Sequence, residues 1–203
     1  MELHVQKNNH EESPEPLILE PTTIASLQTL VKKGEWVAGI SLGEDLESYL
    51  VWALKRLIDK PKFFSGSLAL KFAYAQETVC DKKYLQEVGD TSLLLTGLFP
   101  ERSHHLGVDA SFFSVIGRTA FDNASQCCRR YGQKDLATWY QEARDGFIPM
   151  ADVLLAAHKE PPVTPLHALE LWKETGSIFS RNLFKQKVLN GDNFLATGTI
   201  QRQ

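Results

Sequence analysis

The sequence feature that most constrains the fold is the segment 84–99, which reads YLQEVGDTSLLLTGLF. Coiled into a helix, it would present apolar side chains on nearly every side, as a helix buried inside a larger body does. Uninterrupted apolar runs, such as residues 93–95, are far shorter than the ~20 residues that a membrane-spanning helix needs. Gly89 and Gly97 each cost a helix about 1 kcal/mol relative to alanine, which favours close contact with neighbouring helices over space for a ligand beside the backbone. We therefore expect the central helix of a helical bundle here, and no membrane insertion.

Apolar residues at helical spacing, together with helix-capping residues, predict seven further helices around this one. They cover residues 22–33, 44–59, 67–79, 109–131, 133–158, 166–175 and 178–190. Gly34 is expected to stop the first of them. The apolar stripe of 133–158 keeps its phase across Pro149, which favours one kinked helix over two separate helices. The predicted class is therefore all-α, a single-domain bundle of about six to eight helices over residues 22–191.

The two ends of the chain are predicted to be tails. Residues 1–21 hold five carboxylates and three prolines without helical periodicity, so we expect a flexible acidic tail, and residues 192–203 form the C-terminal tail. Residues 1–21 also lack the apolar core of a secretory signal. The chain has three cysteines, Cys80, Cys127 and Cys128, which cannot all pair internally and are interpreted as reduced, largely buried thiols. These features predict a cytoplasmic protein.

Composition narrows the classes of partner. A chain of 203 residues with 43% hydrophobic content can bury a sizeable core and most simply forms one domain. Its net charge is −3, and no basic stripe follows any predicted helix. Nucleic acid is therefore not an expected partner, because nucleic-acid-binding domains carry a basic patch or stripe.

Residues Gly39-Ile40-Ser41-Leu42-Gly43 match the G-x-S-x-G nucleophile elbow of serine hydrolases. A short apolar stretch precedes the motif, a helix follows it, and His158 and His167 lie downstream. However, only 38 residues precede the motif, too few for the sheet that supports such an elbow, and the rest of the chain supplies no parallel strands. A serine hydrolase using Ser41 is therefore the third of three functional hypotheses.

The turn after the central helix gathers titratable side chains, namely Glu101, His104, His105 and Asp109. Glu101-x-x-His104 resembles half of the ligand set of a carboxylate-bridged dimetal site, which needs a second such pair and two more glutamates. A mononuclear zinc or iron site formed by the four residues remains an alternative. Because the dimetal ligand set is incomplete, no metal and no cofactor is predicted.

Asp90 projects onto an almost wholly apolar helix, and a buried carboxylate is costly unless it is paired or hydrogen-bonded. We therefore predict a largely buried Asp90 that is hydrogen-bonded or ion-paired, with Arg or Lys, a helix N-terminus or backbone amides as the possible partners. Arg118 is the leading candidate and Lys71 the next, with Arg56 as the third available cation. Glu47 has a similarly apolar setting and the same requirement.

The pattern VGD-x-SLLL-x-GLFPE, at residues 88–101, is followed by a helix rich in aromatic residues and glycine. Over roughly residues 45–130 the chain resembles uncharacterised all-helical bacterial proteins. The resemblance implies a compact bacterial helical domain and brings with it no function and no catalytic residue.

Three functional hypotheses follow. The first is a non-enzymatic cytosolic binding, adaptor or regulatory protein that contacts a protein partner or itself, with Trp52 or Trp172 as an exposed anchor. The second is a helical enzyme or a protein that binds a small ligand or metal. The third is the hydrolase built on Ser41. The pocket of the second hypothesis would gather Asp90, Glu101, His104, His105, Asp109 and Arg118.

Overall fold

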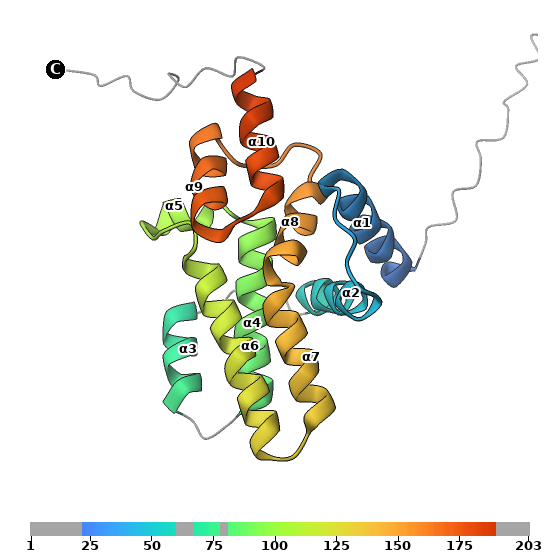
Figure 1. Ribbon diagram of the computed structural model, residues 1–203, viewed down its shortest axis with the longest axis vertical. Coiled ribbons are helices and arrows are strands. Elements are labelled where there is room, and N and C mark those ends of the chain that lie inside the picture. Colours follow the sequence, from blue (N-terminus) through green and yellow to red (C-terminus); the bar gives the residue numbers. More distant parts are fainter. Residues whose placement is uncertain (1–21, 60–66, 78–80, 190–203) are drawn as a thin grey trace, which may run out of the picture.

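The computed structural model describes residues 22–59, 67–77 and 81–189, and these residues form ten α-helices with no strand among them (Figure 1). The predicted all-α class is confirmed, and the helices outnumber the six to eight expected. The predicted tails at 1–21 and 192–203 lie outside the described residues. In chain order the helices are α1 (Thr23–Ala38), α2 (Glu44–Asp59), α3 (Leu68–Glu77), α4 (Lys82–Leu98), α5 (Arg102–Leu106), α6 (Phe112–Arg130), α7 (Lys134–Asp145), α8 (Phe147–Ala157), α9 (Pro165–Thr175) and α10 (Ile178–Leu189).

Two differences account for the higher number of helices. The short helix α5 occupies what was expected to be a polar turn after Pro100. The segment 133–158 is also two helices rather than one kinked helix, and the break lies at Gly146. Pro149 falls in the first turn of α8, where a missing N–H removes no helical hydrogen bond. At Gly146 a side chain would overlap Leu46 of α2, so the break allows α2 to approach closely.

Helix α1 continues through Gly34, which was wrongly expected to end it, and stops at Gly39 in the left-handed region with φ of 66°. Gly34 is buried against α8, where a β-carbon would overlap the carbonyl oxygen of Val153. A glycine inside this helix therefore marks a close helix contact, and the glycine with positive φ marks the end.

The expected central helix is α4, in which every residue from Val88 to Gly97 is buried. It packs mainly against α6 and α8, and Figure 1 shows these three helices side by side in the middle of the bundle. Gly89 faces the ring of Phe121 in α6, and Gly97 faces Leu154 in α8, at distances that leave no room for a β-carbon. Close packing against these two helices explains why positions 89 and 97 of α4 are occupied by glycine.

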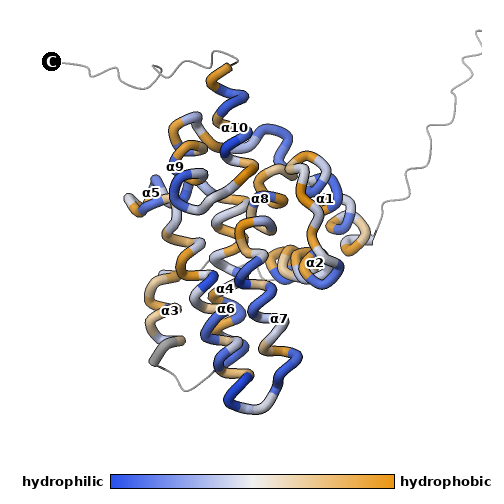
Figure 2. The backbone as a smooth tube through the Cα atoms, viewed as in Figure 1, coloured by the Kyte–Doolittle hydropathy of each residue, from blue (hydrophilic) through white to orange (hydrophobic). Residues whose placement is uncertain are grey.

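Three hydrophobic clusters make up the core. The largest joins α1, α2, α3, α4, α6, α7 and α8. The second lies between α8, α9 and α10 and includes Ala38 at the end of α1, and the third lies between α3, α4 and α6. In Figure 2, α8 is hydrophobic along most of its length, whereas the ends of α6 and α7 around their connection are hydrophilic. The second and third clusters are small, and both surface cavities described below lie beside them.

Candidate functional site

Asp90 lies in the core, where two residues of α2 reach it. Tyr49 and Arg56 stand two helical turns apart, so both side chains leave α2 towards α4. The Tyr49 hydroxyl donates a hydrogen bond to Oδ1 of Asp90, and Nε of Arg56 donates one to Oδ2 over 2.9 Å. Nη2 of Arg56 lies 2.8 Å from the same Oδ2, and the guanidinium stands 5.5 Å from the centre of the Tyr49 ring. The predicted burial and pairing of Asp90 are thus confirmed, whereas the leading partner, Arg118, and the second, Lys71, are wrong.

The electrostatics of this group follow from burial. Asp90 is 1% exposed, and burial raises the pKa of its carboxyl group, while the Arg56 guanidinium and the Tyr49 hydroxyl oppose that rise. Burial and the neighbouring Asp90 charge raise the pKa of Tyr49 well above its ordinary value. Tyr49 therefore remains a neutral hydrogen-bond donor. The Arg56 side chain is 31% exposed, so the ion pair runs from the core towards the surface.

Aromatic rings fill the space around this ion pair. The Tyr49 ring centre lies 4.7 Å from that of Trp139 and 6.0 Å from that of Phe121. Tyr140 packs against Trp139, donates from its hydroxyl to Gln86 over 3.3 Å, and has a pKa raised to about 12, chiefly by burial. None of the three cavities described below is lined by Asp90. This arrangement fixes α2 against α4, which is a structural role.

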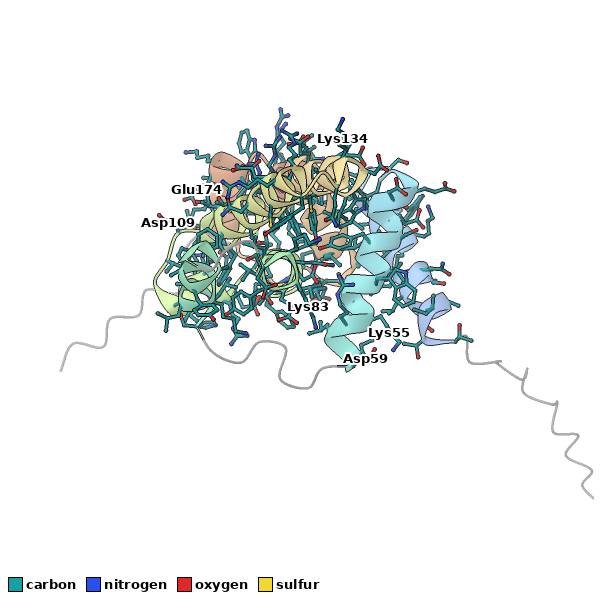
Figure 3. All side chains as sticks on the ribbon, turned by 90° about the horizontal axis from the view of Figure 1, so that it is seen from below. Lys55, Asp59, Lys83, Asp109, Lys134 and Glu174 are labelled. Carbon is teal, nitrogen blue, oxygen red and sulfur yellow. The ribbon has the colours of Figure 1, made fainter. Side chains whose placement is uncertain are left out.

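The other residues of the predicted pocket lie away from Asp90. Glu101 immediately precedes α5, which carries His104 and His105, both exposed. Asp109 is exposed in the connection to α6 (Figure 3). Eight residues of helix, roughly 12 Å, separate Asp90 from the end of α4. Arg118 is exposed on α6. The structure therefore gathers the loop residues around α5 and keeps Asp90 apart from them.

Helix α5 contacts α9 through His104 and His167, a contact that the sequence did not indicate. The ring centres of His104 and His167 are 4.3 Å apart, and Nε2 of His104 lies 3.3 Å from Oε2 of Glu170. His167 is buried, and burial together with His104 lowers its pKa to about 4. Among the described residues, no group of three or more His, Cys, Asp or Glu side chains is arranged to hold a metal ion.

Ser41 is exposed in the loop between α1 and α2. The element before it is helix α1, so the strand–turn–helix geometry of a nucleophile elbow is lacking over residues 22–59. The buried carboxylate of Glu35 accepts a hydrogen bond from the Leu42 amide over 2.7 Å and shapes the loop. Lys32 lies 3.1 Å from Glu35 and 2.6 Å from Glu47, which supplies the cation that Glu47 was expected to need.

Asp152 is another buried carboxylate, and the sequence pattern did not predict its burial. It projects from α8 to the start of α10, where it accepts hydrogen bonds from the Ser177 hydroxyl over 2.5 Å and from the Phe179 amide over 3.2 Å. Burial raises the pKa of Asp152 to about 6, although these hydrogen bonds lower it. The carboxylate thus caps α10 from another helix, beside a water-sized cavity of about 10 Å³.

Two larger cavities open at the surface. One, which we name the α1–α10 groove, has a volume of about 580 Å³ and lies between the ends of α1 and α8 and one face of α10. The other, the α3–α5 cavity, has a volume of about 350 Å³ and lies between α3, α4, α5 and the start of α6. Both volumes fall in the range of ligand-binding pockets.

The cysteines differ from expectation. Cys127 is disulfide-bonded, so its prediction as a reduced thiol is wrong. Cys128 is a free, buried cysteine, and burial raises the pKa of its thiol. Cys80 lies outside the described residues. Reduced thiols therefore no longer support the cytoplasmic location, which stays a prediction.

No protein-family model, no curated protein and no solved structure matches the chain. Within the residues that the structure describes, no helix combines the length and the apolar character needed to cross a membrane.

Proposed function

We propose that the protein acts by binding, as a non-enzymatic adaptor or regulator, and that it docks an acidic, amphipathic segment of a partner protein in the α1–α10 groove. The observation that carries the proposal is the combination of an open groove with an apolar floor, two lysines on its rim and, next to it in the sequence, a tryptophan that is 85% exposed. Catalysis is the weaker alternative, because the buried carboxylates Asp90 and Asp152 are both engaged in joining helices.

The floor of the groove is apolar. Ala38 of α1, Ala156 of α8 and Phe179 and Leu183 of α10 all line it, and they belong to the second hydrophobic cluster. Val37, also in the lining, is 42% exposed. An apolar floor that opens to solvent is suited to the hydrophobic face of a docked peptide.

The rim of the groove is basic on a chain whose net charge is −3. Lys159 and Lys187 line it, with Glu160 as the only acidic residue among its lining side chains. Helix α10, which supplies Lys187, has no acidic residue and carries two further cations outside the lining, Arg181 and Lys185. This local excess of positive charge favours a partner segment that carries carboxylates, since complementary charges guide association and select the partner.

A tryptophan stands next to the lining residues. Trp36, one residue before Val37, is 85% exposed, although tryptophan side chains are on average highly buried in folded proteins. Trp52 and Trp172, the anchors expected from sequence, are less suitable. Trp52 is 54% exposed on α2, and Trp172 packs under the guanidinium of Arg181 at 5.5 Å. Tryptophan is among the residues that most often dominate binding energy at protein interfaces.

A peptide-display selection against the purified chain tests the proposal. We expect the selected peptides to combine Asp or Glu with Leu or Phe, and the best of them to bind at least tenfold more weakly to Lys187→Glu. Trp36→Ala should weaken binding by a comparable factor. Lys134→Glu is the matched control, because Lys134 is exposed at the start of α7, away from the groove (Figure 3).

Two outcomes would overturn the proposal. One is a selection that yields no peptide whose binding depends on Lys187 and Trp36. The other is a preference for single-stranded or double-stranded nucleic acid over the peptides, with the same dependence on Lys187, because that would identify the basic rim as a phosphate-binding surface.

A further inference from the structure

We infer that the α3–α5 cavity binds a small amphipathic carboxylate, with its unbranched apolar tail against the cavity wall and its carboxylate beside Lys71. This site is separate from the α1–α10 groove and does not depend on the function proposed there. The inference rests on the apolar lining of the cavity, on the partial burial of Lys71 without an ion pair among the described residues, and on the first turn of α3, which lines the cavity.

The wall of the cavity is hydrophobic and comes from four helices and one loop. Its apolar members are Leu68, Ala69, Leu95, Leu106, Val108, Phe112 and Phe113. Leu106, on α5, is 62% exposed although it borders a cavity that an apolar group could fill. At about 350 Å³ the cavity is near the lower end of the range for ligand pockets, which indicates a small ligand.

Lys71 supplies the charge. It is half-buried in the lining of the cavity, and none of its contacts within the described part of the chain is an ion pair or a side-chain hydrogen bond. A cation that is partly removed from water and has no partner is unfavourable, and an anion bound beside it would relieve that cost. A second cation, Arg102, lines the same cavity.

The local backbone also favours an anion. Helix α3 begins at Leu68, and Ser67 accepts a hydrogen bond from the Leu70 amide. The amides of Leu68 and Ala69 have no carbonyl of their own helix within reach, because they lie in its first turn. Both residues line the cavity, so the positive end of the helix dipole lies at the same place as Lys71.

The remaining polar residue of the wall fits a carboxylate head less well. The hydroxyl of Thr91 donates to the carbonyl of Glu87 over 2.7 Å, so its proton is not available to a ligand. We therefore place the anion beside Lys71 and the first turn of α3, with Arg102 as a second cation in the lining, while the tail contacts the apolar wall. A bare inorganic anion would leave that wall unused, and a neutral hydrocarbon would leave Lys71 without a partner.

Isothermal titration with straight-chain carboxylates, from butanoate to dodecanoate and below their micelle-forming concentrations, tests the inference on the full chain. Affinity should rise about fourfold for each added methylene until the tail fills the cavity, following the ~0.8 kcal/mol gained per buried CH₂. Octanoate should bind at least tenfold more tightly than 1-octanol, because only the carboxylate uses Lys71.

Matched variants locate the binding. Lys71→Gln should weaken octanoate binding about tenfold and leave 1-octanol unchanged. Lys83→Gln should change neither, because Lys83 is exposed on the first turn of α4 and lies outside the lining (Figure 3). Leu106→Gln should weaken both ligands, whereas Leu189→Gln, at an exposed position on α10, should weaken neither. The inference is overturned if octanoate does not bind saturably, if octanol binds equally well, or if Lys71→Gln and Lys83→Gln behave alike.

Discussion

Arg56 binds Asp90 through a single carboxylate oxygen, Oδ2, which leaves Oδ1 for the hydroxyl of Tyr49. Two turns of α2 are thereby joined to the middle of α4 by one side chain. The two members of the ion pair differ in their access to water, since the Arg56 side chain is 31% exposed and that of Asp90 is 2% exposed. This asymmetry determines which substitution is more costly.

Removal of Arg56 should therefore destabilise the protein more than removal of Asp90. Arg56→Ala leaves a buried carboxylate without its cation, and we expect a loss of about 3–5 kcal/mol in the free energy of unfolding. Asp90→Ala leaves a guanidinium on a side chain that is 31% exposed, and it leaves the buried Tyr49 hydroxyl, which is neutral, without its acceptor. Its loss should therefore be smaller, at about 2–3 kcal/mol. Urea denaturation of both variants measures the difference. Arg118→Ala is the control and should change stability by less than about 0.5 kcal/mol, because Arg118 is exposed. A larger effect at Arg118 than at Arg56 would contradict the pairing.

Asp152 should make the protein less stable as the pH rises. Its folded pKa of about 6 lies above the ordinary value of 3.8, so the folded state holds this proton more tightly than the unfolded state. The corresponding stability is fully present below pH ~4 and is lost as the pH rises through about 6, by about 2–3 kcal/mol in total. Asp152→Asn, which does not titrate, should remove this component from the curve of unfolding free energy against pH. Asp135→Asn, at an exposed site, should leave the curve unchanged.

His167 should lower the free energy of unfolding as the pH falls, which is opposite to the effect of Asp152, over nearly the same pH range. Its folded pKa of about 4 lies below the ordinary value of 6.5, so the unfolded state takes up the proton first. Stability is therefore lost as the pH falls from about 6.5 to about 4, by about 2–3 kcal/mol. His167→Gln should remove this component while Asp152 still titrates, so the unfolding free energy of the variant should increase relative to that of the wild type as the pH falls through this range. His105→Gln, at an exposed position, is the matched control. Identical curves for His167→Gln and wild type would contradict the burial of a neutral histidine.

Local sequence patterns predicted most of the helices, because helical periodicity is a property of neighbouring residues. They did not predict which helices meet. Arg56 is 34 positions before Asp90, and nothing in the spacing of either residue favours this pair over Arg118, which projects outward from α6. His104 and His167 are separated by more than sixty positions and meet only because α5 packs on α9.

The errors at helix ends have a similar origin. Gly34 was expected from local propensity to end its helix, and Pro149 was expected to kink a single helix over residues 133–158. The actual break at Gly146 and the continuation through Gly34 depend on the approach of a distant helix, with Val153 of α8 beside Gly34 and Leu46 of α2 beside Gly146. Tertiary packing overrides propensity in these places. The cavities were beyond sequence reasoning for the same reason, since each is lined by residues of at least three helices.

Ser41 should be chemically inert. It is exposed in a loop that follows a helix, with no strand in the described residues to hold it in a nucleophile elbow. Ser41→Ala should change the free energy of unfolding by less than about 0.5 kcal/mol. A fluorophosphonate probe should not label the wild-type protein at this residue. Covalent labelling of Ser41, detected by peptide mass spectrometry and absent in Ser41→Ala, would restore the hydrolase hypothesis.

Gly34 should tolerate no side chain, despite its position in the interior of a helix where alanine is normally favourable. A β-carbon there would overlap the carbonyl oxygen of Val153, which belongs to the backbone of α8 and cannot rotate away. Because α1 and α8 must separate to make room, we expect Gly34→Ala to lower the free energy of unfolding by about 1–3 kcal/mol instead of raising it. Gly43→Ala provides the comparison, since nothing lies within 4 Å of a β-carbon at that position. Thermal melts and urea titrations of the two variants measure the difference. A Gly34→Ala variant as stable as Gly43→Ala would mean that α1 does not pack against α8 at this distance.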